Sequence, residues 1–166
     1  MARIASLILV PVLSSVALMA GDYDAVLDAM KKAWPQVETV AVVCDANGSK
    51  SALGTLTGAA GGLKVIVVDV KGPQDIGKAV ATLASRRPDA MLLLAGDRVA
   101  GDGSSAASFL IQRMAAIKIP TAATTEAGVK QGAALGIGPG TGGKLMSNAK
   151  VAAVAGVAVP AGATAL

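Results

Sequence analysis

Four short polar stretches follow apolar runs in the sequence, at places where a turn would leave a β-strand. They read Asp45-Ala46-Asn47-Gly48-Ser49, Gly96-Asp97-Arg98, Thr124-Thr125-Glu126 and Gly138-Pro139-Gly140-Thr141. The first two combine short polar side chains with backbone amides that precede a helix, which suits a carboxylate, a phosphate or a hydroxyl group. The chemistry that these residues offer is therefore the binding of a small polar molecule.

Most of these residues also have a purely structural interpretation. Asp45 and Asn47 are typical of an Asx turn, and Ser49 is a suitable helix cap. Asp97 can pair with Arg98 or face water, and Glu126 suits the first turn of a helix because its charge complements the helix dipole. On the sequence alone, both the structural and the ligand-binding interpretations stay open.

Catalytic and metal chemistry lack their usual residues in this chain. There is no histidine and one cysteine, Cys44, which removes histidine-based triads and the commonest zinc ligands. The glycine-rich stretch 138–143 is not a P-loop, because Leu145 follows Lys144 where Ser or Thr is needed. We therefore predict no enzyme activity, no catalytic residue, no cofactor and no metal. The alternative is a small α/β enzyme that acts on a phosphorylated or carboxylated compound with Asp45 or Asp97 as acid or base.

Composition narrows the range of partners. The chain has 166 residues, a net charge of +4, 53% hydrophobic residues and only 2% aromatic residues. Nucleic-acid platforms need aromatic side chains for base stacking and clustered basic residues, so we expect no nucleic-acid partner. The length and the apolar content suit one globular domain with a core of small aliphatic side chains.

The first 21 residues, MARIASLILVPVLSSVALMAG, form an apolar segment with two interpretations. It resembles a secretory signal peptide with Ser15-Val16-Ala17 as a cleavage site, or a membrane anchor. It also reads as a buried strand, Ile4–Val10, that ends before Pro11, and we favour this retained strand. A signal predicts a periplasmic or other extracytoplasmic location, and a retained strand predicts a cytoplasmic one.

Residues 22–166 read as a single α/β domain in which strand-like and helix-like patterns alternate. Such strands pair in parallel through helical crossovers, so the expected fold is a three-layer sandwich around a mostly parallel sheet. The helix 22–34 has Val26, Leu27, Met30 and Trp34 on one face. The predicted strands are Val37–Cys44, Leu63–Val70, Ala90–Ala95, Pro120–Thr125 and Ala133–Ile137, and the further predicted helices are Ser49–Ala60, Gln74–Arg87, Ser104–Lys118, Glu126–Gln131 and Gly143–Gly156.

Three segments resemble the second lobe of ABC-transporter substrate-binding proteins, which are type I periplasmic binding proteins. They are LDAMKKAWPQVETVAVVCDANGSKS, PDAMLLLAGDRVAGDGSSAASFLIQRMAAIKIPTAATTEAGVKQGAALGIG and GGKLMSNAKVAAVAGVAVP. The match covers roughly residues 22–160, through many weak similarities of order and without one diagnostic motif. The resemblance implies a flavodoxin-like lobe that binds a small solute between two lobes.

Carried over by position, the resemblance implies ligand contacts from three of the polar turns. The family has two lobes and often sandwiches its ligand with aromatic residues, whereas this sequence matches one lobe and has few aromatic residues. We therefore expect a non-enzymatic solute-binding relative that forms a homo-oligomer, with the membrane component of an ABC transporter as an implied partner. The alternative is a structural or assembly protein with the same fold and no ligand. The predicted ligand-binding residues are Asp45, Asn47, Ser49, Gly96, Asp97, Thr125 and Glu126.

Overall fold

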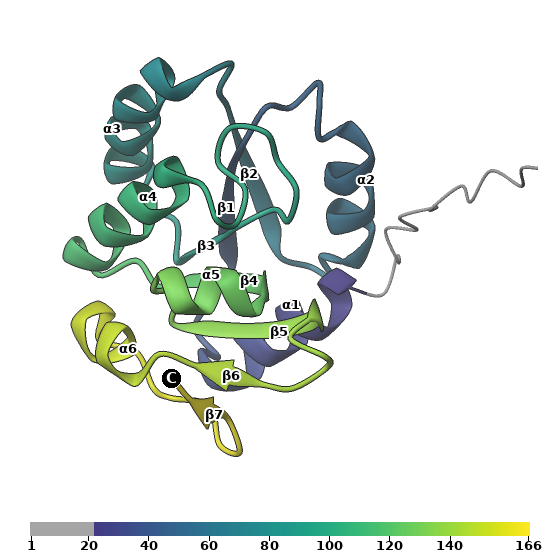
Figure 1. Cartoon of the computed structure of the whole chain (residues 1–166), viewed down its shortest axis with the longest axis vertical. Helices are drawn as coiled ribbons and strands as arrows, with labels where there is room; N and C mark the ends of the chain where they lie inside the picture. The colour runs from purple at the N-terminus through teal and green to yellow at the C-terminus, as the bar shows by residue number, and fades with distance from the viewer. Residues whose placement is uncertain (1–21) are drawn as a thin grey trace, which may run out of the picture.

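The structure, a computed structural model, describes residues 22–166 (Figure 1). The strand or signal expected within residues 1–21 lies outside the described residues. The helices are α1 (Asp22–Ala33), α2 (Lys50–Ala59), α3 (Ile76–Arg86), α4 (Ser105–Ala116), α5 (Glu126–Gln131) and α6 (Ala149–Ala155), with a short 3₁₀ turn at Pro73–Asp75. The strands are β1 (Thr39–Cys44), β2 (Lys64–Asp69), β3 (Ala90–Leu92), β4 (Thr121–Thr125), β5 (Leu135–Gly140), β6 (Met146–Ser147) and β7 (Thr164–Ala165).

Within residues 22–166 the strands form one sheet in the order β2-β1-β3-β4-β5-β6-β7. Neighbours from β2 to β5 run parallel, as expected for strands joined by helical crossovers. The β1–β2 ladder is regular from Thr39 opposite Lys64 to Cys44 opposite Asp69. This register places the last residues of β1 and β2 side by side, and it confirms the predicted mostly parallel α/β sheet.

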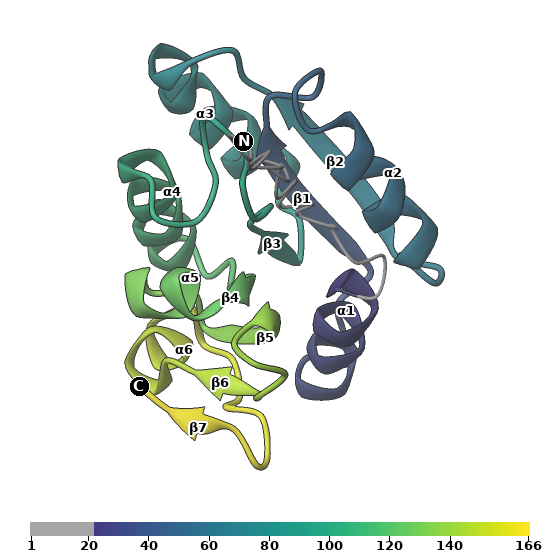
Figure 2. The ribbon, with the colours of Figure 1, turned by 45° about the vertical axis from the view of Figure 1, so that its right-hand side comes forward.

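Alternate side chains of β1 enter two separate cores, because successive residues of a strand point to opposite faces. Val40 and Val42 belong to the cluster that contains Leu27 of α1 and Leu56 of α2. Val43 belongs to the other cluster, with side chains from α3 and α4 such as Leu83, Leu110 and Met114. Figure 2 shows α1 and α2 on one side of the sheet and α3 and α4 on the other, which confirms the three-layer arrangement.

Helix α1 packs with the face that its spacing predicts. Val26, Leu27, Met30 and Trp34 are each at most 1% exposed. The indole N–H of Trp34 donates to the carbonyl of Ala158, at 3.2 Å, and so fixes the C-terminal segment beside α1. Among the described residues, no helix has the length and apolar character needed to cross a membrane.

The C-terminal part of the prediction is wrong in one place. A single helix was expected over residues 143–156, but β6 occupies Met146–Ser147 and pairs antiparallel with β5. The Ser147 hydroxyl is buried and donates to the carbonyl of Ala134 at 2.7 Å. Helix α6 then begins after Asn148, whose side chain accepts a hydrogen bond from the Val151 N–H. A strand of two residues is too short to show a strand period of its own in the sequence.

Candidate functional site

Two turns meet at the edge of the sheet where β1 and β3 end, and the Asp97 carboxylate joins them. One oxygen accepts hydrogen bonds from the backbone N–H of Asp45 at 3.0 Å and from the Ser49 hydroxyl at 2.6 Å. The other accepts from the N–H groups of Val99 and Ala100, at 2.9 and 2.8 Å. Asp97 is only 7% exposed. The bonds from Asp45 and Ser49 hold the β1–α2 turn against the β3–α4 loop, and those from Val99 and Ala100 fix the loop itself.

Asp45 is the centre of an ion-pair cluster at the same edge. Its carboxylate oxygens lie 3.0 Å from the Lys71 ammonium and 2.5 Å from Nε of Arg98. The hydrogen bonds from Arg98 and then Lys71 lower the pKa of Asp45 to about 2. The Asp45 side chain is 6% exposed, whereas those of Arg98 and Lys71 are 63% and 49% exposed. The cluster thus presents donors to solvent and keeps its central acceptor covered.

The end of β2 contributes two residues that the sequence analysis missed, Asp69 and Lys71. Asp69, the last residue of β2, accepts hydrogen bonds from the Ala46 N–H and the Lys71 ammonium, each at 2.9 Å. These bonds, chiefly the one from Lys71, lower the pKa of Asp69. The residues could have been found by treating β2 as a neighbour of β1, because its polar exit would then lie beside Asp45. Arg98 was considered but not selected, because pairing with Asp97 or exposure to water was the favoured interpretation. In the structure it pairs with Asp45, 53 positions away.

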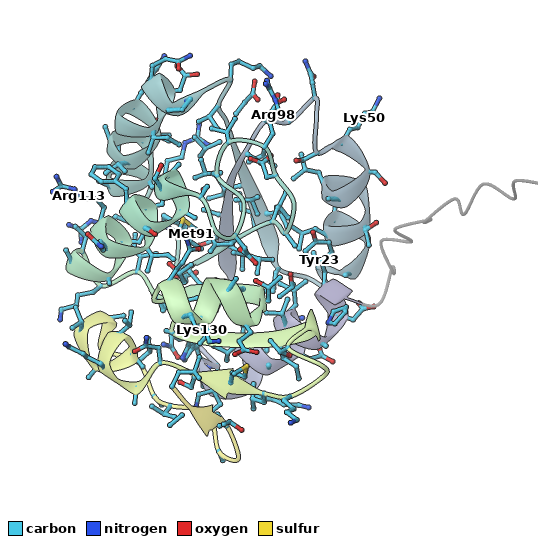
Figure 3. The ribbon with its side chains drawn as sticks, viewed as in Figure 1. Tyr23, Lys50, Met91, Arg98, Arg113 and Lys130 are labelled. Atoms are coloured by element: carbon cyan, nitrogen blue, oxygen red, sulfur yellow. The ribbon has the colours of Figure 1, made fainter. Side chains whose placement is uncertain are left out.

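The other predicted residues of the first two turns border this cluster. Asn47 and Gly96 are exposed, and Gly96 has a φ of +75°, which favours glycine. Ser49 precedes α2 but does not cap it with its side chain; its hydroxyl donates to Asp97 instead of accepting from the helix. Figure 3 shows Arg98 and Lys50 at the same edge of the molecule.

The predicted residues of the third turn belong to a separate hydrogen-bonded group. The Thr125 hydroxyl caps α5 by accepting from the Gly128 N–H at 3.1 Å, and it donates to Asp102. Glu126 pairs with Lys130 one turn along α5, at 2.6 Å. The β3–α4 loop contains both Asp97 and Asp102, so it connects this group to the Asp45 cluster.

The fourth polar turn, residues 138–141, overlaps the end of β5, and it is closed on itself: the Thr141 hydroxyl accepts from the Gly138 N–H at 3.1 Å. Cys44, just before Asp45, is not activated as a nucleophile. Burial and then the charges of nearby carboxylates, Asp97 first, raise the pKa of its thiol to about 12.

Among residues 22–166, no group of three or more His, Cys, Asp or Glu side chains is placed to hold a metal ion. The chemistry that this edge supports is hydrogen bonding and ion pairing.

Comparison with models of protein families finds no match, and no curated protein has a matching sequence. Several solved structures share the fold. A conserved domain protein from Vibrio cholerae has a TM-score of 0.72 and 20% identity, over 86% of this chain and 59% of that one. The ABC domain in complex with L-Trp from Streptococcus pneumoniae has a TM-score of 0.70 and 18% identity, over 87% and 61%. A ligand-free, open substrate-binding protein with adhesive properties from Clostridium difficile has a TM-score of 0.71 and 16% identity, over 85% and 58%.

These likenesses concern the fold, because sequence identity is at most 20% in each. The chain spans about three fifths of the length of the three proteins. The resemblance to substrate-binding proteins is therefore confirmed for the architecture of residues 22–166, which has the fold expected of one lobe of such a protein.

Proposed function

We propose that this chain is a non-enzymatic solute-binding lobe, with its ligand site at the edge where β1, β2 and β3 end. The observation that carries the proposal is the Asp45 cluster, a covered carboxylate flanked by the exposed cations Lys71 and Arg98. It lies beyond the carboxyl ends of parallel strands, where open α/β sheets generally bind ligands. The similar folds of one substrate-binding protein and of an ABC domain in complex with L-Trp support the same class of function.

The chemistry of this edge favours a solute with an anionic or other hydrogen-bond-accepting group. Asp97 and Asp45 already accept hydrogen bonds at both carboxylate oxygens. The outward-facing charges of Arg98 and Lys71 are donors, and Arg98 is oriented by its pairing with Asp45. Helix α2 adds amides at its first turn, which contains no acidic residue and has no side-chain cap. Asn47 and Gly96 border this surface, and Asp97 and Ser49 act by holding its two turns in place.

The proposal extends to the setting of the lobe. The similar proteins are longer than this chain, so a second lobe or a second copy of the chain would complete the cleft. Thr125 and Glu126, at the end of β4, are proposed to lie at the border of that cleft. An extracytoplasmic location and a membrane partner of the ABC-transporter class follow from the same proposal.

The test is an NMR titration of the protein with acetate, inorganic phosphate and methylammonium as separate probes. We expect both anions to shift the amide signals of the turns around Arg98, and methylammonium to leave them unchanged. Arg98→Gln should weaken anion binding about tenfold or more, consistent with the loss of one charge-assisted hydrogen bond. The matched control is Arg113→Gln, because Arg113 lies over the Phe109 ring on α4, away from the cluster.

Anion-induced shifts that are equal in wild type and Arg98→Gln would contradict the proposed site. Shifts produced by methylammonium alone would show that the site prefers a cation, which contradicts the proposed charge of the ligand. We expect Arg98→Gln to keep the wild-type fold, because the Arg98 side chain is mostly exposed and belongs to neither core. A change in anion binding can then be attributed to the site.

A second candidate function is self-association without a ligand, and strand β2 favours it. Among the described residues β2 ends the sheet on one side, and its sequence KVIVVD is partly exposed, with Val67 at 41%. An exposed apolar edge strand is a surface on which another chain can pair. Val67→Lys should then lower the particle mass in solution, whereas Val154→Lys, on α6, should not. A wild-type monomer would exclude this candidate.

A further inference from the structure

Asp97 and Asp102 lie five positions apart in one loop, yet their carboxylates have opposite surroundings. Asp97 accepts four hydrogen bonds. For Asp102, Oδ2 accepts one hydrogen bond, from the Thr125 hydroxyl, and Oδ1 is buried without a partner among the described residues. An ionised carboxylate has about four acceptor positions to satisfy, and a buried, unpaired oxygen penalises the charged form. The surroundings of the Asp102 carboxyl therefore favour its neutral, protonated form.

The carboxyl of Asp102 packs tightly against the start of α5. A Cβ atom at position 128 would lie 3.2 Å from Oδ1 of Asp102, so the glycine at this position allows the close approach. Thr125, which holds Asp102, also accepts from the Gly128 N–H. A second attachment lies next to it, where the Gly103 N–H donates to the side chain of Gln131 at 2.8 Å. Asp102 and the Gln131 side chain, which also donates to the carbonyl of Ser104, thus fix the end of the β3–α4 loop to α5.

The charged groups around Asp102 do not offset its burial. On α5 these are Glu126 and Lys130, which pair with each other, and β4 carries no titratable side chain. On its own loop, Asp97 is bonded to backbone and hydroxyl donors and Arg98 pairs with Asp45. The burial of Asp102 raises the pKa of its carboxyl, and the Thr125 hydroxyl opposes this only in part.

We propose that Asp102 is a pH-dependent latch between the β3–α4 loop and α5. While the carboxyl is protonated, it stays buried against Gly128 and Thr125. Ionisation leaves Oδ1 charged without a donor, so the carboxylate turns toward water and the contact with Thr125 weakens. Thr125 borders the third polar turn, so the latch would position that turn, but the proposal stands whether or not the edge binds a solute.

The sign of the pH effect follows from the direction of the shift. Because the protonated form is favoured in the folded state, the stabilisation is complete at acid pH and is lost as the pH rises through the pKa of Asp102. Asp89 gives the opposite case. Although burial acts in the other direction, its bonds to Thr39 and Glu38 lower the pKa of Asp89, so its contribution is lost as the pH falls.

The test is an NMR titration of the Asp102 carboxyl carbon in the full chain, from about pH 3 to pH 8. We expect its midpoint to lie above those of the other assigned aspartates, and the amide signal of Gly128 to move with the same midpoint. Asp102→Asn, which is neutral at every pH, should remove that movement of Gly128. As the pH rises through the Asp102 midpoint, the Tm of wild type should also fall relative to the Tm of Asp102→Asn. The expected fall is about 3–5 °C for each pH unit by which the midpoint exceeds the pKa of an ordinary aspartate.

Asp89→Asn is the matched control, because it removes a carboxylate whose pKa is shifted the other way and should leave the Gly128 transition in place. An Asp102 midpoint at or below the ordinary aspartate value would overturn the proposal. So would a Gly128 signal that does not follow the Asp102 titration. Both measurements use wild-type protein, so they decide the question even if Asp102→Asn fails to fold.

Discussion

Replacement of Asp97 by asparagine should destabilise the chain more than any other single-atom change at this edge. The substitution keeps the size of the side chain but turns one acceptor oxygen into a donor group. Asp97 accepts two hydrogen bonds at each oxygen. Whichever way the amide turns, two of the four donors face an N–H₂ group.

The expected cost can be worked out from these bonds. If the remaining oxygen serves Val99 and Ala100, then the buried Asp45 N–H loses its acceptor and the Ser49 hydroxyl must rotate. A buried donor left unpaired costs about 1–3 kcal/mol, and a lost bond to a charged group costs about 1.5–3 kcal/mol. Part of this is recovered when Ser49 finds water, so we expect a loss of about 2–4 kcal/mol. That is a large fraction of the roughly 5–15 kcal/mol by which a domain is stable.

The assay is urea unfolding of wild type and Asp97→Asn at one pH, with Asp28→Asn as the control because Asp28 is exposed on α1. Asp97→Asn should lower the midpoint with little change in the slope, while the control should stay within about 0.5 kcal/mol of wild type. Amide exchange at Asp45 should accelerate in Asp97→Asn. Equal stabilities of the two variants would refute the view that Asp97 joins the two turns.

Three further outcomes are expected. Cys44 should resist alkylation in the native state at mildly alkaline pH and react after unfolding, because its pKa is raised to about 12; rapid native labelling by iodoacetamide would contradict its burial. Gly128→Ala should lower the Tm, since its Cβ would lie 2.5 Å from a neighbouring Cβ, whereas Gly58→Ala has open space and should raise stability by about 0.4–1 kcal/mol. Arg98→Gln should raise the pKa of Asp45 from about 2 toward the ordinary aspartate value. The stability that Asp45 loses as the pH falls would then be smaller, and the loss would be complete at a higher pH, because the folded pKa moves closer to the unfolded one. An unchanged carbon-shift titration of Asp45 would argue against the ion pair.

The architecture could be read largely from local patterns. The helical spacing of Met30 and Trp34 and the uncharged run of β1 depend on period and composition, which survive in any tertiary context. The parallel sheet then follows from the alternation of strands and helices. The boundaries that failed, at β6 and α6, involve a strand of two residues, which is too short to show a period of its own.

The candidate site divides along the same line. The sequence placed Asp45, Ser49 and Asp97 at one sheet edge, because the carboxyl ends of parallel strands must lie together. It did not distinguish the residues that hold the turns together from those that offer a side chain to a ligand. Asp97 has its oxygens filled by the protein itself, while Arg98 is exposed and oriented. Which groups are satisfied internally depends on distances between loops that are tens of residues apart.

What the sequence by itself determined is the order of the elements, the identity of the buried helix face and the edge at which polar turns collect. These properties arise from short-range periodicity and from the geometry common to all parallel sheets. Only the tertiary structure decided that Lys71 and Arg98 share the carboxylate of Asp45, and that Oδ1 of Asp102 lies buried without a donor among the described residues. The reason is physical: hydrogen-bond satisfaction and desolvation are set by atoms within a few ångströms, and in a folded chain most such neighbours are remote in sequence.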